Sequence, residues 1–343
     1  MLRIAQVTLA VALLVTPGCL RADTNDGASL APWRENLRFA LDVSARASYD
    51  TREEELARIE FLGFDLHKVF SSNTGDWGTL LLQGYMTRID GVERHPPFFD
   101  DSHDWEFVYR IFNLNVTRFG GRAFNVRIGH FEVPFGLEQV INTNGTLRDY
   151  THGRNLGLKA DWGVTINGDL PAFEYELAVS RGSGNTWETR GRPHVLSGRV
   201  GTSRDRSIIL GLGAFKADVV DEAEPDGTRS RWRVGADAQW YVGRFGVLGE
   251  LAIGADEGRE VVNGLLELDL ASRDDSWLLF AQARRFAEEF RGHGWDAATR
   301  VSLGITYSLP RELDLSAQWE RDLSAFRGQR EANAVTVQIR QRF

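Results

Sequence analysis

The chain has 343 residues, a formal net charge of −8 at pH 7, 42% hydrophobic residues and a mean hydropathy of −0.30. The acidic balance argues against nucleic acid as a partner. Beyond the N-terminal apolar run, no stretch offers the roughly 18 consecutive apolar residues of a transmembrane helix.

The N-terminus has the pattern of a secretory signal peptide. Arg3 precedes an apolar run that ends at Val15, and residues 20–22 offer a cleavage site. The only cysteine, Cys19, lies before that site, so cleavage leaves no disulfide and no thiol chemistry. Lipidation of Cys19 is the alternative that stays open. We predict three segments: a signal peptide at 1–22, a short lead-in at 23–35 and one large domain at 36–343.

From residue 36 onward, apolar and polar residues alternate with the period of a β-strand, which gives one apolar and one polar face. In the last such segment Val335, Val337 and Ile339 share one parity, and Thr336 and Gln338 fall on the other. The strand-like segments number about sixteen: 36–46, 56–70, 76–89, 105–119, 123–135, 156–167, 173–181, 194–203, 207–218, 230–242, 245–255, 260–272, 276–288, 297–309, 312–322 and 332–343. Three of them have apolar residues on both parities: 76–89, 105–119 and 276–288.

The connections between these segments give a second test. Short turns are expected after the even-numbered segments of an outer-membrane barrel, and longer external loops after the odd-numbered ones. The longer connections are 90–104, 136–155, 181–193 and 219–228. Aromatic residues near the segment ends fit the girdles of such a barrel. We therefore predict an all-β fold, a transmembrane antiparallel β-barrel of about 16 strands with up-and-down topology, in the outer membrane of a Gram-negative-type bacterium.

Two stretches resemble the phosphate-selective porin O and P family of outer-membrane channels. Residues 127–138 read R-I-G-H-F-E-V-P-F-G-L-E, and residues 153–158 read G-R-N-L-G-L, which is similar to a strand end, loop and strand start of that family. Residues 58–64 resemble its early strand. The resemblance is clearest over residues 56–185. It implies a sixteen-stranded, usually trimeric porin with general or anion-preferring passage.

The inward parity departs from what the resemblance implies for phosphate-selective members, which are expected to have a lysine-rich constriction. This chain has only three lysines, and acidic and basic residues nearly balance on that parity. Facing rows of charge would create a field across the pore that orients dipolar solutes. The alternative is a solvated wall of paired charges. The predicted lining residues of the strands are Arg127, Lys159, Arg233, Arg300, Arg340, Glu250 and Glu267.

The connection 136–155 is the best candidate for a constriction. Pro134 removes a ladder donor and favours a bend at the strand end, and irregular backbone is tolerated at membrane depth where it borders water. We predict that this loop folds into the lumen. The alternative is an external loop that packs on a neighbouring molecule. Its predicted constriction residues are Glu138, Arg148, Asp149 and Arg154.

No catalytic or cofactor motif is present. The seven histidines show no metal-ligand spacing, and no nucleophile elbow, phosphate-binding loop or haem attachment motif occurs. We predict a non-enzymatic porin without cofactor or metal, through which small hydrophilic solutes or ions diffuse passively. The expected partners are outer-membrane lipid, the solutes and further copies in a homotrimer. The alternative is a non-channel barrel that acts as a scaffold or sleeve for a surface or electron-transfer protein.

Overall fold

The computed structural model describes residues 35–73, 75–91, 104–117, 119, 123–187, 189–221, 227–290 and 294–343. Contacts divide the chain into the units Met1–Leu37 and Arg38–Phe343, and the second unit holds the barrel. The predicted signal peptide at 1–22 lies outside the described residues, as does all of the lead-in except residue 35.

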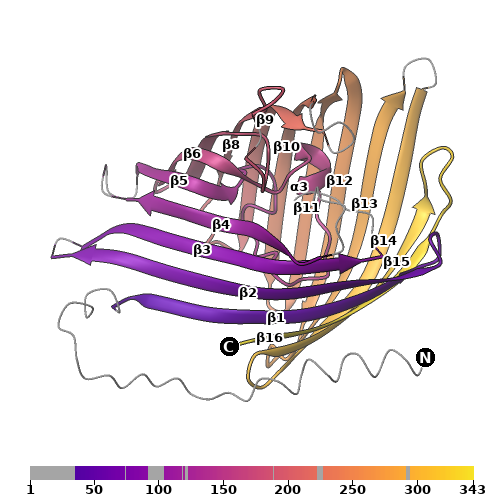
Figure 1. The fold of residues 1–343 in the computed structure, drawn as a ribbon, viewed down its shortest axis with the longest axis horizontal. Coiled ribbons are helices and arrows are strands. Elements are labelled where there is room, and N and C mark those ends of the chain that lie inside the picture. Colours follow the sequence, from indigo (N-terminus) through magenta and orange to yellow (C-terminus); the bar gives the residue numbers. More distant parts are fainter. Residues whose placement is uncertain are drawn as a thin grey trace. The chain divides into compact units, whose positions relative to one another are not determined.

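Sixteen strands form a closed barrel in which consecutive strands are neighbours and β1 closes onto β16 (Figure 1). The strands are β1 (Leu37–Asp50), β2 (Glu55–Ser72), β3 (Gly75–Asp90), β4 (Glu106–Val116), β5 (Asn125–Glu132), β6 (Ala160–Asp169), β7 (Glu174–Ser180), β8 (His194–Gly201), β9 (Ile208–Val220), β10 (Thr228–Val242), β11 (Phe245–Asp256), β12 (Arg259–Ala271), β13 (Trp277–Phe290), β14 (Gly294–Leu309), β15 (Leu313–Ser324) and β16 (Asn333–Arg342). The helix α3 (His152–Leu156) lies between β5 and β6. At the seam, β1 and β16 pair antiparallel from Asp42 opposite Arg342 to Asp50 opposite Ala334. The predicted fold class and topology are confirmed.

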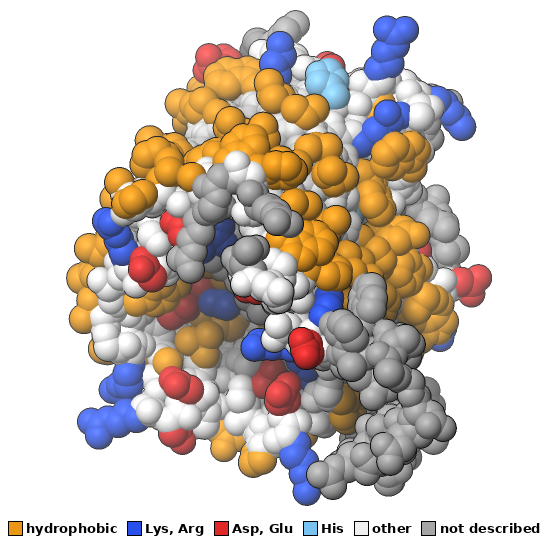
Figure 2. Space-filling view, turned by 90° about the vertical axis from the view of Figure 1, so that its left-hand side faces the viewer, with side chains coloured by type: hydrophobic (Ala, Val, Ile, Leu, Met, Phe, Trp, Pro, Cys, Tyr) orange, Lys and Arg blue, Asp and Glu red, His pale blue; other side chains and the backbone are white. Residues whose placement is uncertain are grey.

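The period-2 alternation separates two environments along the strands. In β9, Leu210 and Leu212 are 50% and 63% exposed, whereas Phe215 on the opposite parity is 4% exposed. The outward parity is apolar over most of each strand, and Figure 2 shows hydrophobic side chains over much of the visible outer surface. The inward parity carries buried polar and charged residues, among them Asp237 and Gln239 of β10. The three segments with apolar residues on both parities do form strands, namely β3, β4 and β13.

Two sequence expectations need correction. The segment 156–167 was expected to be strand throughout, but β6 begins only at Ala160, because α3 ends at Leu156 and the left-handed Gly157 (φ 83°) turns the chain. The expected difference between long and short connections also fails on part of the barrel. The β11–β12 connection, after an odd-numbered strand, consists of residues 257 and 258 alone.

The short strand β5 leaves part of β4 without a neighbouring strand in the barrel wall. Because β5 has only eight residues, β4 pairs with it only from Phe112 to Val116. The β7–β8 connection completes the wall there. The Asn185 side chain accepts a hydrogen bond from the Tyr109 amide at 2.7 Å and donates to the Phe107 carbonyl at 3.3 Å, as a neighbouring strand would. Asp161 of β6 accepts the amides of residues 182 and 184 at 2.5 and 3.1 Å, which holds this connection in place.

Candidate functional site

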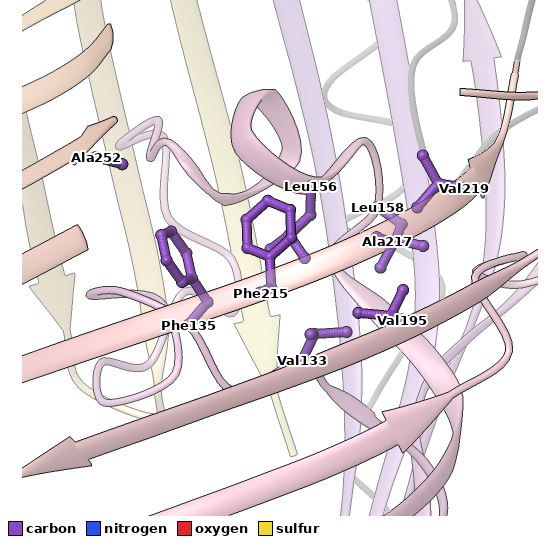
Figure 3. Close-up of a cluster of buried hydrophobic side chains, with 9 residues drawn as sticks. All are labelled: Val133, Phe135, Leu156, Leu158, Val195, Phe215, Ala217, Val219 and Ala252. Atoms are coloured by element: carbon purple, nitrogen blue, oxygen red, sulfur yellow. The ribbon is translucent and has the colours of Figure 1, made fainter. Parts of the chain in front are cut away.

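The residues between β5 and β6, 133–159, form an inner loop that packs on the inward face of the barrel. Its side chains Val133, Phe135, Leu156 and Leu158 join a buried cluster with Val195 of β8, with Phe215, Ala217 and Val219 of β9, and with Ala252 of β11 (Figure 3). Phe135 and Phe215 meet edge to face with ring centroids 5.0 Å apart. Fully burying such a side chain contributes about 1.5–3 kcal/mol. The cluster therefore fixes both ends of the inner loop to the wall.

A buried carboxylate holds the middle of the inner loop. Glu250 of β11 accepts hydrogen bonds from the Leu137 amide at 2.7 Å, from the Asn155 amide group at 3.1 Å and from the Thr151 hydroxyl. Asn155 in turn accepts from Asn263 of β12 at 3.1 Å. Figure 1 shows α3 beside β11 and β12, which agrees with these contacts. Glu250 thus satisfies loop donors that are cut off from water.

A second buried carboxylate, Glu267 of β12, holds the next turn of the inner loop. Arg148 reaches it at 3.0 Å and the Tyr150 hydroxyl at 3.3 Å. Gln282 of β13 donates to Glu267 at 2.5 Å and exchanges hydrogen bonds at 3.2 Å with the backbone of Asp149. Asp149 also pairs with Arg284. The charges of this turn are therefore largely neutralised by the wall.

The tip of the inner loop reaches the barrel seam. Arg340 of β16 donates to the Asn144 carbonyl at 3.1 Å, and Gln338 donates to the Gly145 carbonyl at 2.6 Å. Arg46 of β1 donates to the Thr146 carbonyl at 3.1 Å. Gly145 has φ +69°, and a Cβ there would meet the Arg340 guanidinium. Since the loop starts at β5 and contacts β11, β12, β13, β16 and β1, it crosses the interior.

Three titratable groups lie where the inner loop returns to the wall. Buried Glu138 is 3.5 Å from the His152 Nδ1 atom and 3.4 Å from the Lys159 Nζ atom. Burial, with a smaller contribution from Lys159, lowers the pKa of His152 to about 3. The ring is therefore neutral at ordinary pH. Lys159 is 47% exposed and presents its ammonium group to the interior.

Beside the inner loop lies a cavity of about 1280 Å³. It is bordered by β1–β5, β14–β16, residues 143–149, and residues 159 and 160, where β6 begins. Figure 2 shows charged side chains of both signs around a hollow in the visible face. Most of its basic residues are paired: Arg110 with Glu132 at 3.3 Å, Arg300 with Asp322 at 2.6 Å, and Arg340 with Asp42. Among the described arginines and lysines that border it, Arg46 is the one without a carboxylate in ion-pair range, and it donates instead to Gln338 at 2.7 and 3.0 Å. The cavity wall is thus polar with little excess charge.

The residues predicted from sequence fall into two groups. Those that border the large cavity are Arg148, Asp149, Lys159, Arg300 and Arg340. Those that are absent from its border are Glu138, Arg154, Arg127, Arg233, Glu250 and Glu267.

The predicted residues that are absent from the cavity border make other contacts. Arg233 is fully buried and pairs with Asp256 at 2.7 Å. Arg154 lies over the Phe286 ring, 4.3 Å from its centroid. Arg127 pairs with Glu176 at 2.8 Å beside a second cavity of about 140 Å³.

Arg46 and Arg110 are among the cavity residues that were not predicted from the sequence. Arg46 shares the inward parity with Asp42 and could have been found by that signal. Arg110 could not, because the β3–β4 register shifts between Gln83 and Gly84 and leaves Arg110 as the extra residue of β4. A bulge reverses the parity that alternation assigns.

Among the described residues, no helix is both long and apolar enough to cross a membrane. In the same part of the chain, no group of three or more His, Cys, Asp or Glu residues could hold a metal ion.

Comparison with known proteins identifies the fold. No family model and no curated protein matches the chain. Among solved structures, the anion-selective porin from Comamonas acidovorans matches with TM-score 0.64 and 12% identity over 90% of this chain and 99% of the porin. The trimer form of the outer-membrane protein OmpT of Vibrio cholerae gives 0.60 and 14% over 90% and 99%. Salmonella typhi OmpF gives 0.65 and 10% over 90% and 97%. The chain therefore has the fold of outer-membrane porins.

Proposed function

We propose that this protein is an outer-membrane porin through which small hydrophilic solutes or ions diffuse passively. The observation that carries the proposal is the pairing of an apolar outer surface with a polar interior cavity of about 1280 Å³ in one closed barrel. The apolar surface suits lipid, and the polar cavity suits water and hydrated solutes. The porin fold of the solved relatives supports the same function. No catalytic step or cofactor is involved.

In this proposal the inner loop narrows the pore. Its tip contacts Arg46, Gln338 and Arg340 at the seam, so a solute passes through the space that the loop leaves beside β1–β4. Solute size is then limited by a loop that is fixed by buried contacts. Charges on the two sides of this space filter ions.

Selectivity is proposed to be weak. Most basic groups of the cavity are paired with carboxylates, which removes most of the field that a solute would meet. The described lining holds seven Arg or Lys and eight Asp or Glu side chains, so neither sign of charge dominates the cavity. This arrangement supports a general porin over a strongly phosphate-selective one, although the sequence resemblance over 56–185 points to the phosphate-selective family.

The remaining expectations are part of the proposal. Delivery by a signal peptide at 1–22 would bring the chain to the outer membrane, and the trimer form of OmpT supports a homotrimer. A sleeve around a protein partner is less well supported. A folded partner would have to displace the inner loop from Glu250, Glu267 and the buried cluster.

Liposome swelling tests the proposal. Liposomes that contain the purified protein should swell in isotonic solutions of monosaccharides faster than in solutions of larger oligosaccharides. Liposomes with heat-denatured protein serve as the control. Equal swelling in protein-containing and control liposomes with every sugar would overturn the proposal.

A further inference from the structure

We propose that the large cavity is a binding site for uncharged pyranose sugars, which lie with one ring face on an apolar strip of its otherwise polar wall. The inference rests on the proposed porin function, because it names a class of solute for the same interior. The apolar strip consists of residues that all border the cavity: Ala57, Ile59 and Phe61 of β2, Tyr85 of β3 and Val108 of β4.

Strand pairing brings the apolar strip together. Ala57, Ile59 and Phe61 occupy three successive inward positions of β2. Tyr85 stands opposite Val108 in the β3–β4 ladder. The Phe61 and Tyr85 rings meet edge to face, with centroids 6.3 Å apart and planes at 81°. A continuous apolar surface with two aromatic rings therefore borders the cavity, at a place where the wall of a water-filled barrel is ordinarily polar.

The rest of the cavity wall offers hydrogen bonds without excess charge. Its described lining has seven Arg or Lys and eight Asp or Glu side chains. Its neutral groups include the hydroxyls of Ser44, Ser48 and Thr336 and the amide groups of Gln318 and Gln338. A charged solute gains little from such a wall, because its charge meets no excess of the opposite sign. An uncharged solute with many hydroxyl groups can pair with the wall at several points.

Two buried polar groups that border the cavity have no hydrogen-bond partner within the described part of the chain. They are the Thr87 hydroxyl of β3 and the side-chain carbonyl of Gln318 of β15, and these residues are 1% and 4% exposed. Thr87 stands opposite Phe61 in the β2–β3 ladder, so it lies beside the apolar strip. Buried polar groups ordinarily have partners, because an unmet hydrogen bond is costly. A ligand with hydroxyl groups at this place supplies the missing partners.

The apolar strip, the compensated charge and the unpartnered polar groups together select the sugar. A pyranose ring in its chair form exposes C–H groups on its faces and hydroxyl groups around its edge. Its apolar face leaves water when it lies on the Phe61 and Tyr85 rings, and its edge hydroxyls reach polar groups such as Thr87. An acyclic polyol carries as many hydroxyl groups but has no fixed apolar face, and ordering its flexible chain costs entropy. The cavity therefore distinguishes sugars from other uncharged solutes of the same size.

Uptake of labelled D-glucose and labelled sorbitol into liposomes that contain the full-length protein tests the inference. The two solutes are uncharged and nearly equal in size, so a pore that only sieves passes them equally. The test variants are Phe61→Ser, which removes a ring from the apolar strip, and Thr87→Val, which removes the hydroxyl and keeps the shape of the side chain. The matched control is Leu62→Ser, because Leu62 is the next residue of β2 and is 51% exposed on the outward face.

In the wild type and in Leu62→Ser, glucose uptake should saturate and should exceed sorbitol uptake at low concentration, whereas sorbitol uptake should rise linearly. The half-saturating glucose concentration should increase about tenfold in Phe61→Ser, which loses an aromatic contact, and about fivefold in Thr87→Val, which loses a hydrogen bond.

Three results would overturn the inference: equal and linear uptake of both solutes by the wild type, an unchanged half-saturating concentration in either test variant that folds, or an equal change in Leu62→Ser. Sorbitol uptake separates this inference from the proposed function. A barrel that passes sorbitol without preferring glucose would refute only the sugar site, whereas a folded barrel that passes neither solute would refute the porin.

Discussion

Replacing Glu250 by alanine should release the middle of the inner loop while leaving the barrel intact. The change removes the acceptor of the Leu137 amide at 2.7 Å, of the Asn155 side chain at 3.1 Å and of the Thr151 hydroxyl. Leaving a buried donor without its acceptor costs about 1–3 kcal/mol, and the change affects three donors. About 4 kcal/mol corresponds to a factor of roughly 1000 in the ratio of docked to released loop.

The strands should not unfold, because the backbone ladders of β11, in which residue 250 takes part, and the Phe135–Phe215 contact do not use the Glu250 side chain. The loss therefore appears as local opening. The backbone amide of Asn155 donates to the Thr151 carbonyl at 2.8 Å. Its hydrogen exchange should accelerate by about 100-fold to 1000-fold. Single-channel current should become noisier.

Glu260→Ala is the matched control, since this exposed glutamate of the neighbouring strand β12 holds no loop residue. Its exchange and current noise should equal those of the wild type. If Glu250→Ala also left both quantities unchanged, the loop would be held by other contacts, and the anchoring role of Glu250 would be refuted.

Further predictions concern the pore, the loop and the wall. Deleting residues 142–149 should raise single-channel conductance in planar bilayers, because the loop tip crosses the interior; unchanged conductance would place the pore elsewhere. Arg46→Gln combined with Lys159→Gln should move the reversal potential towards cation preference, since five Arg or Lys would then face eight Asp or Glu in the described cavity lining. Acidification should loosen the loop, because released His152 takes up a proton below its ordinary pKa of 6.5 and docked His152 only below about 3. The docked loop then loses about 2 kcal/mol of stability at pH 5, and any attraction between protonated His152 and nearby Glu138 reduces this loss. Hydrogen exchange of the loop should therefore be faster at pH 5 than at pH 7.5, and His152→Gln should abolish this difference. Asp161→Ala should lower the thermal unfolding temperature, because it deprives the amides of residues 182 and 184 of their acceptor; an unchanged temperature would refute its role in closing the wall.

The fold could be predicted from the sequence because a barrel wall imposes one rule on every strand. Lipid on one side and water on the other demand alternation, and Val335, Val337 and Ile339 obey it as the residues of β9 do. The rule fails where an apolar residue is buried by something other than lipid. Leu156 and Leu158 looked like the start of a strand, but they pack inward against β9 as parts of the inner loop.

The site could be predicted only in part, since parity says which side chains point inward and not what covers them. Glu250 and Glu267 do point inward, yet both are buried under the inner loop and anchor it. Which carboxylate a buried arginine meets depends on register, as the pairing of Arg233 with Asp256 across the β10–β11 ladder shows. The pairing register between neighbouring strands is set when the barrel closes. The residue pattern of a single sequence does not specify it.

The most direct test of the central claim is a planar-bilayer recording of the purified protein with a salt gradient across the membrane. A passive porin with a largely charge-compensated cavity should give ohmic current steps and a reversal potential close to zero. Absence of discrete steps at any protein concentration, with correctly folded barrel in the membrane, would contradict the account.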